Sequence, residues 1–131
     1  MNVNELRMGS YVFGLDGLTH YVEGLSSNSV VTHGIAANSV STHIDTQETT
    51  VRPIPLTLEW LVRFGFNKKL GLAQGIEVHV LEKLTIAKMG DRYIPAFLNH
   101  NDEISLIGSE VKFVHQLQNL YIALTGDELL I

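Results

Sequence analysis

Two prolines, Pro53 and Pro55, place the strongest constraint on how this chain can fold. Proline has no backbone N–H to donate to a β-ladder, so a strand pattern that reaches this pair must end there or lie at a sheet edge. The residues before the pair read as short strands between turns, and the residues after it begin with a helix signal. We therefore expect two subdomains, residues 1–55 and 56–131, or one compact domain that contains both.

The first subdomain is predicted to be β-rich. Asp16-Gly17 between two strand-like runs is a strong signal for a two-residue hairpin turn. Strands this short and this closely spaced are typical of a small barrel or sandwich. The predicted strands are Ser10–Gly14, Leu18–Gly24, Ser29–His33, Ser39–Ile44 and Thr49–Ile54.

The second subdomain is predicted to hold a short helix, an antiparallel meander and a C-terminal amphipathic helix. Thr57 is placed to cap the short helix with its side chain, and Gly65 is placed to close it in a left-handed conformation. Strand alternation over residues 76–86 is interrupted at Glu82, which predicts a bulge or a turn there. The fold class is therefore α+β, and the remaining strands of the meander are Tyr93–Leu98 and Glu103–Ile107.

The C-terminal helix has the clearest apolar face in the sequence. At 100° per residue its apolar side chains fall within an arc of roughly 120°. His115 and Gln118 lie off this arc and are predicted to face solvent, and Gly126 supplies the stop. The arc consists of Phe113, Val114, Leu117, Leu120, Tyr121 and Leu124.

The segment Asn28–Asp45 contains the pattern Asn-Ser-Val-x-Thr-His twice, and its histidines raise the question of a metal site. A connecting loop at Gly34–Ala37 makes the two copies an antiparallel hairpin with His33 and His43 at opposite ends. They are then roughly 16 Å apart at about 3.3 Å per residue, too far for one metal ion. Two copies are too few for a solenoid. We predict two structural strands and no metal site, with an approach of His20 from a neighbouring strand as the alternative.

The composition limits the chemistry further. The 131-residue chain has no cysteine, which excludes disulfides, thiolate metal sites and cysteine nucleophiles. No stretch approaches the ~18 consecutive apolar residues of a membrane span. The polar N-terminus lacks the apolar core of a signal peptide. We expect a cytoplasmic protein without membrane contact.

No catalytic or nucleotide-binding signature stands out. The sequence lacks the H-E-x-x-H, G-x-S-x-G, G-x-G-x-x-G and P-loop patterns. His79 beside Glu77 is typical of a surface contact, and His100 belongs to a polar turn cluster with Asp102 and Glu103. No nucleophile, base and oxyanion donors are assembled. We predict a protein that is not an enzyme, with no catalytic residues and no cofactor.

The net charge of −5 is distributed unevenly along the chain. Residues 1–51 and 101–131 each hold one basic residue against five acidic ones, so both ends repel nucleic acid. Residues 67–100 hold five basic residues against three acidic ones, and this part attracts an anion. Scattered lysines that solvate one sheet face are the alternative. The candidate anion-binding residues are Lys69, Lys83, Lys88 and Arg92, of which Arg92 can bind a phosphate in a bidentate manner.

Apolar residues outside the predicted core favour self-association. Ile122 lies on the polar side of the last helix, and the sequence ends in Leu129-Leu130-Ile131. Coverage of these residues within one chain is the alternative. We predict a homo-oligomer, with the anion site in a cleft between subdomains or between subunits.

Three stretches, Asn4–Val12, Arg52–Phe66 and Phe113–Leu129, cover about a third of the chain. The second contains PIPLTLEWLVRFGF, and the third reads FVHQLQNLYIALTGDEL. In these stretches the chain resembles a family of small uncharacterised proteins of gut bacteria and their phages. The resemblance implies a small accessory protein of phage or mobile-element type, in the host cytoplasm if a phage encodes it. It implies no site residues.

These observations favour a non-catalytic binding protein that sequesters a host protein or a small nucleotide signal in phage–host conflict. The alternative is a structural or assembly component of a virion, which a regular homo-oligomer without ligand would favour. A weaker alternative is nucleic-acid binding through residues 1–55, which the acidic balance of that part opposes. Nucleotide hydrolysis has no catalytic set to support it.

Overall fold

The computed structural model describes residues 5–14, 16–25, 29–35, 41–45, 51–69, 76–101 and 103–131, with the backbone alone for Ser29 and residues 41–45. The chain forms two compact units. Unit 1 comprises Met1–Pro55 and Phe113–Asn119, and unit 2 comprises Leu56–Lys112 and Leu120–Ile131. The first division falls directly after the proline pair, whereas the start of the last helix belongs to unit 1. None of the described helices is long and apolar enough to cross a membrane.

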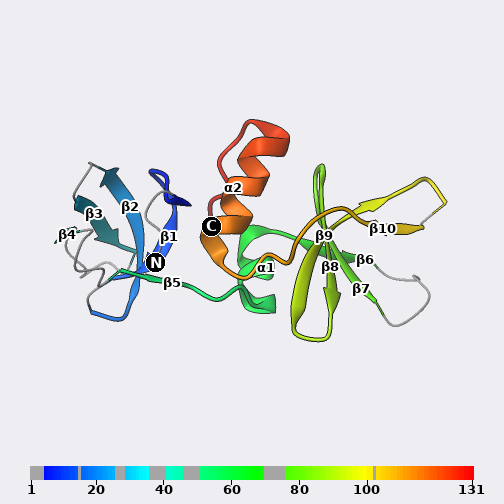
Figure 1. Ribbon diagram of the computed structural model, residues 1–131, viewed down its shortest axis with the longest axis horizontal. Coiled ribbons are helices and arrows are strands. Elements are labelled where there is room, and N and C mark those ends of the chain that lie inside the picture. Colours follow the sequence, from blue (N-terminus) through cyan, green and yellow to red (C-terminus); the bar gives the residue numbers. More distant parts are fainter. Residues whose placement is uncertain are drawn as a thin grey trace. The chain divides into compact units, whose positions relative to one another are not determined.

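Unit 1 is built on one antiparallel sheet with the strand order β4-β3-β2-β1-β5 (Figure 1). Buried side chains of three strands pack with one residue before β1 and one residue before β5. This core consists of Leu6, Val12, Val22, Val30 and Val51. Ser39 and Thr49, where two strands were predicted to begin, lie outside the described residues. The strands are β1 Tyr11–Phe13, β2 Thr19–Leu25, β3 Ser29–Gly34, β4 Ser41–Asp45 and β5 Arg52–Pro53.

A turn that contains Asp16 and Gly17 connects β1 to β2, as predicted, but the predicted two-residue loop is wrong, because Gly14 N–H bonds the Leu18 carbonyl and three residues lie between them. Gly17 has a φ of +75°, which glycine adopts without a Cβ clash. The Asp16 carboxylate accepts a hydrogen bond from the backbone N–H of Leu18 at 3.0 Å. This bond favours the ionised carboxylate and is the main cause of the lowered pKa of Asp16.

The repeated segment forms the predicted antiparallel hairpin, but in a different register. His33 pairs with Ser41, and His43 pairs with Val31. The two histidine backbones are therefore two residues apart along the ladder, about 7 Å at ~3.3 Å per residue, and the predicted separation of roughly 16 Å is wrong. Loop length sets the register of a hairpin, and the repeat does not encode it. The loop begins later than Gly34, because β3 includes that residue.

Unit 2 begins with helix α1, Leu58–Phe64. As predicted, the helix ends at Gly65, whose φ of +94° turns its N–H back to carbonyls of the last turn. The predicted side-chain cap is wrong, because Thr57 occupies the N-cap position without a capping hydrogen bond. Thr57 is exposed, so water can satisfy the free amide groups in its place. The helix buries Trp60, Leu61 and Phe64.

The sheet of unit 2 confirms the antiparallel meander and has the strand order β10-β9-β8-β7-β6 (Figure 1). A two-residue turn at Glu82 and Lys83 joins β7 to β8, where the interrupted alternation predicted a break. Glu82 has a φ of +50°, a left-handed conformation that is uncommon outside glycine. The strands are β6 Asn67–Lys69, β7 Glu77–Leu81, β8 Leu84–Met89, β9 Arg92–Leu98 and β10 Ile104–Leu106. With the two helices found among the described residues, the fold is α+β.

Helix α2, Val114–Thr125, confirms the predicted C-terminal helix. It ends at Gly126, whose φ is +79°. Leu117 is fully buried, as predicted, whereas Leu124 at the end of the predicted apolar arc is 43% exposed. The buried face is therefore shorter at its C-terminal end than the periodicity predicts.

His115 and Gln118 of α2 are buried, although the helical pattern predicted that both face solvent. The Gln118 oxygen accepts a hydrogen bond from the backbone N–H of Tyr11 at 2.8 Å, and its amide donates to the carbonyl of Gly9 at 2.9 Å. His115 Nε2 lies 3.0 Å from the Glu5 carboxylate. Polar side chains are buried where they find such partners, and hydrophobic periodicity does not detect this.

Candidate functional site

The candidate site lies on the face of the unit 2 sheet that is turned away from α1. Directly paired residues share a face, and alternate residues of a strand point to opposite faces. An ideal Cβ at Gly65, the end of α1, lies 3.8 Å from Leu81, which assigns α1 to the face of Leu81. The opposite face carries a row of directly paired residues across four strands: Asn67, Val80, Thr85 and Ala96.

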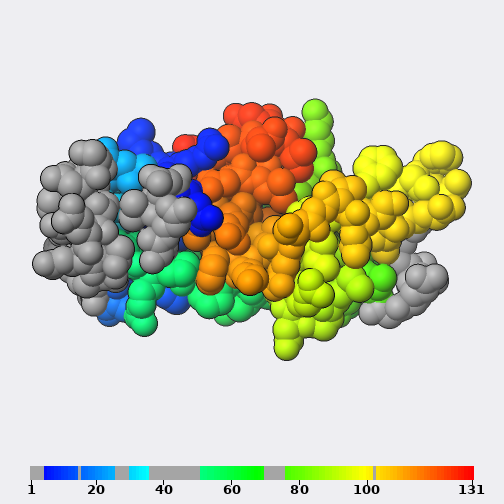
Figure 2. Space-filling view, viewed as in Figure 1, coloured from blue at the N-terminus to red at the C-terminus, as the bar shows by residue number. Residues whose placement is uncertain are grey.

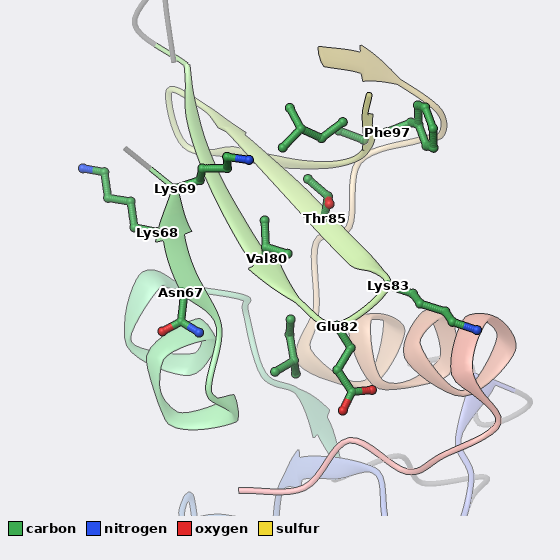
Figure 3. Close-up of a pocket in the computed structure, with 11 residues that line it drawn as sticks. Asn67, Lys68, Lys69, Val80, Glu82, Lys83, Thr85 and Phe97 are labelled. Atoms are coloured by element: carbon green, nitrogen blue, oxygen red, sulfur yellow. The ribbon is translucent and has the colours of Figure 1, made fainter. Parts of the chain in front are cut away.

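Small residues in this row leave a pocket of about 760 Å³ (Figure 3). Thr85 and Ala96 stand where longer side chains would fill the space. Residues of β6 and β9 line the same pocket although two strands separate them in the sheet, so the sheet is curved around it. The apolar part of the lining is Val80, Leu81, Ala96, Phe97 and Leu98.

Three lysines line the pocket. Figure 3 shows the Lys69 side chain extending over the sheet toward Thr85, whereas Lys68 and Lys83 point away from it. Lys68 Nζ lies 3.3 Å from the Glu77 carboxylate, and this contact is the main cause of the lowered pKa of Glu77. Lys83 forms no ion pair with any residue in the described part of the chain. Lys69 is therefore the lysine that extends over the pocket floor, and Lys83 stands at the rim.

Glu82 contributes the carboxylate of the lining. It accepts a hydrogen bond from the Tyr121 hydroxyl at 3.1 Å. Desolvation and this carboxylate raise the pKa of Tyr121, so the phenol stays protonated and continues to donate. Figure 3 shows Glu82 directed away from Thr85. The carboxylate is thus bound to Tyr121 and directed away from the pocket floor.

Thr85 places an unpaired hydroxyl in the pocket floor. Its side chain is 8% exposed, and it forms no hydrogen bond with any described residue. Among the described residues, the Thr85 oxygen is not one of the fully buried polar atoms that lack a partner, so water or a ligand can reach it and bond to it. Asn67, at the end of the same row, also forms no hydrogen bond within the described part of the chain. A ligand with polar atoms over this row would satisfy both groups.

The four predicted anion-binding residues fall into two pairs. Lys69 and Lys83 line the pocket. Lys88 pairs with Glu77 across β7 and β8 and belongs to the face that α1 covers. Arg92 Nε lies 3.3 Å from the Glu110 carboxylate. The structure does not bring the second pair to the first, because the turn that exposes Lys83 lies at one end of β8 and Lys88 lies near the other.

Neither Asn67 nor Thr85 was predicted from the sequence, because the prediction of an anion site rested on charged residues alone. A polar residue and an alanine at facing positions of two adjacent strands are a weak signal, and the register between the strands is needed to recognise it.

Neither His79 nor His100 lines the pocket. His79 is 5% exposed, and its Nε2 lies 3.4 Å from Glu77, so the predicted surface contact is wrong. The reason is that both faces of β7 are partly covered, which period-two alternation cannot show. His100 is exposed, and its neighbour Asp102 lies outside the described residues. The described residues contain no group of three or more His, Cys, Asp or Glu side chains that could hold a metal ion.

His20 lies between Thr32 and Asp16, and this order of side chains resembles the nucleophile, base and acid of a catalytic triad. Its Nδ1 lies 3.1 Å from Thr32 Oγ1, and its Nε2 lies 2.8 Å from Asp16 Oδ1. Thr32 and His20 are 0% and 1% exposed, so no substrate reaches the hydroxyl. This cluster supports the core of unit 1 and is a poor candidate for catalysis.

Comparison of the chain with protein-family models, with curated proteins and with solved structures finds no match. The resemblance to small proteins of gut bacteria and their phages therefore stays a prediction. The chemistry of the pocket in unit 2 then provides the basis for a functional proposal.

Proposed function

We propose that this chain is a non-catalytic binding protein whose pocket in unit 2 takes a small phosphate-bearing ligand of the nucleotide class. The observation that carries the proposal is the Thr85 hydroxyl in an apolar floor, with Lys69 extending over that floor and Lys83 at the rim of the pocket. Ligand sites typically combine an apolar lining with a few convergent polar groups that fix the orientation of the ligand. The pocket has this composition.

Each part of a nucleotide finds a matching group. Lysine ammonium groups are mobile point charges with three donors each, and Lys69 and Lys83 suit a phosphate. Val80 and Ala96 offer a flat apolar contact to a base. Phe97 is 58% exposed at the rim, but it alternates with Ala96 along β9 and points to the other face, so the base contact rests on Val80 and Ala96. The Thr85 hydroxyl then serves a polar atom of the base or the sugar.

Binding without turnover is consistent with the chemistry of the lining. Glu82 is the titratable acid among the lining residues, and its carboxylate is engaged by Tyr121. Sequestration of a small nucleotide signal in a host cell is the role we propose for such a binder, and the resemblance in three stretches supports it. A host protein as the ligand, or a role in a virion, is the alternative.

Isothermal titration calorimetry tests the proposal. Linear and cyclic mono- and dinucleotides are titrated at low ionic strength, because exposed lysines give salt-sensitive attraction. The variant Lys69→Gln/Lys83→Gln should bind at least about tenfold more weakly, equivalent to ~1.4 kcal/mol. Thr85→Val keeps the shape of the floor and should weaken binding without lowering the melting temperature. Arg92→Gln removes one positive charge outside the pocket and should bind like the parent protein.

Mass spectrometry of what copurifies with the protein from cells identifies the ligand independently. No heat with any nucleotide, or equal affinity in all four proteins, would overturn the proposal and favour the protein-binding or virion role. Equal weakening by Arg92→Gln would show a diffuse charge effect in place of a pocket.

A further inference from the structure

The two edges of the unit 2 sheet carry opposite chemistry. At one edge, β6 consists of Asn67–Lys69, all exposed and two of them charged. Charged residues on an edge strand, lysine above all, discourage pairing with another chain. At the other edge, β10 consists of Ile104–Leu106 and carries no charge. No described strand pairs with its outer side. One edge is protected and the other is open.

The hydrogen bonds of β10 determine which of its backbone groups remain free. The carbonyl of Glu103 and the N–H of Ile107 point toward β9, where they bond backbone groups at 3.1 and 2.9 Å. The direction of these groups alternates along an antiparallel strand. The N–H and C=O groups of Ile104 and Leu106 therefore point outward and can pair with a further strand.

Exposed apolar side chains accompany this open edge. Phe97, Leu106 and Ile107 are 58%, 46% and 59% exposed. Figure 2 shows the hairpin of β9 and β10, in yellow, at the surface of the molecule. An uncharged edge strand beside exposed apolar side chains is a template for strand pairing.

We infer that β10 pairs with β10 of a second copy of this chain, antiparallel about a two-fold axis at Ser105. The short strand is self-complementary in this arrangement. Ile104 lies opposite Leu106 of the partner subunit, so apolar residues meet apolar residues. Ser105 lies opposite Ser105 of the partner subunit, and these small residues leave room for Phe97, which stands beside Ser105 in the sheet.

The charge pattern of β10 is compatible with a second copy as the occupant. Each copy has a net charge of −5, so two copies repel unless the contact keeps their acids apart. In the proposed register Glu103 lies opposite Ile107 of the partner subunit, and no carboxylate of the strand lies opposite another. The outward groups of Ile104 and Leu106 then form about four backbone hydrogen bonds between the copies.

The contact area predicts how strong the association is. Large side chains bury about 150–250 Å² each, so three that are half exposed supply roughly 300 Å² per copy. Both copies together then bury roughly 600 Å² of side-chain surface, below the ~1,200 Å² of a standard stable interface. The pairing is therefore concentration-dependent. It also places self-association on β10; in the C-terminal segment Leu129 is buried, whereas Leu130 and Ile131 are 52% and 42% exposed.

Cysteine cross-linking tests the register directly, because the chain has no cysteine of its own. Ser105 and its counterpart form a non-hydrogen-bonded pair with a Cα separation of about 4.5 Å, within the ~4.4–6.8 Å of disulfides. Mild oxidation of Ser105→Cys at high protein concentration should give a covalent dimer on a non-reducing gel. Ser109→Cys, which is also exposed but lies beyond β10, should give little. Absent or equal cross-linking in the two variants overturns the proposal.

Sedimentation velocity over a concentration series provides a second test that needs no cysteine. The parent protein should shift from monomer to dimer as its concentration rises. Leu106→Lys introduces an edge lysine and should abolish the shift. Val62→Lys alters a side chain on α1 that is 69% exposed and should retain it. A parent protein that stays monomeric, or a Leu106→Lys variant that dimerises normally, overturns the proposal.

Discussion

Replacement of Gly14 by alanine is expected to destabilise unit 1 strongly. An added Cβ would lie 2.6 Å from Cδ2 and 2.7 Å from Nε2 of the His20 ring. Carbon atoms do not approach so closely, so the ring must move. The ring is held on both sides, because Nε2 lies 2.8 Å from Asp16 Oδ1 and Nδ1 lies 3.1 Å from Thr32 Oγ1.

Two terms give the size of the effect. Overpacking a close-packed site costs about 1–3 kcal/mol. A shifted ring also leaves a buried polar atom of His20 or Thr32 unpaired, which costs roughly 1–3 kcal/mol. The two residues are 1% and 0% exposed, so water does not replace the lost partner. The free energy of unfolding of unit 1 should fall by roughly 2–6 kcal/mol, a large part of the ~5–15 kcal/mol typical of a domain.

Amide hydrogen exchange of β1, β2 and β3 measures this loss, because Trp60 lies in unit 2 and its fluorescence reports the other unit. Gly24→Ala is the matched control. Its added Cβ lies 3.7 Å from Cβ of Val31, an ordinary contact, so stability should change by less than about 0.5 kcal/mol. In a His20→Ala background, Gly14→Ala should no longer be destabilising. Full protection of the strands in Gly14→Ala, or equal loss in Gly24→Ala, would refute the reasoning.

Leu117→Ala should lower the free energy of unfolding by ~2–5 kcal/mol because this side chain is fully buried. Leu124→Ala, at a position that is 43% exposed, should lower it by less than about 1 kcal/mol. Urea denaturation measures both changes. Gln118→Ala should cost roughly 1–3 kcal/mol in the same assay, because two backbone groups lose their partner. The folded state lowers the pKa of Asp16, chiefly through the Leu18 N–H bond, so its stabilising contribution is complete above the ordinary value of 3.8 and is lost as pH falls through the lower folded value. Asp16→Asn should therefore flatten the acid limb of the stability curve, and an unchanged limb would contradict this assignment.

The sequence predicted the features that short stretches determine. The Asp16-Gly17 turn, the stop at Gly65 and the break at Glu82 each depend on a few neighbouring residues. The register of β3 and β4 depends on a longer loop, and it differs from the prediction. The buried state of Gln118 depends on Tyr11, far away in the chain, and no local pattern reveals it.

Part of the pocket could also be predicted from the sequence, because the lysine content of a segment is a local feature. An excess of lysines in residues 67–100 indicated an anion site, and Lys69 and Lys83 line the pocket. Which lysines share a face depends on the turn that follows β7 and on the pairing of β6 with it. These pairings also bring Thr85 into the pocket floor, and a charge pattern does not identify a threonine.

Nucleotide titration followed by backbone amide NMR tests the central claim most directly, because it reports binding and place together. The nucleotide with the largest calorimetric heat is added to isotope-labelled protein and to Lys69→Gln/Lys83→Gln. The pocket predicts that chemical shifts change at residues 67–69, 80–85 and 96–98, that they saturate with one ligand per chain, and that the double variant loses them. Shift changes centred on unit 1, or the same changes in the double variant, would contradict a ligand site on this sheet.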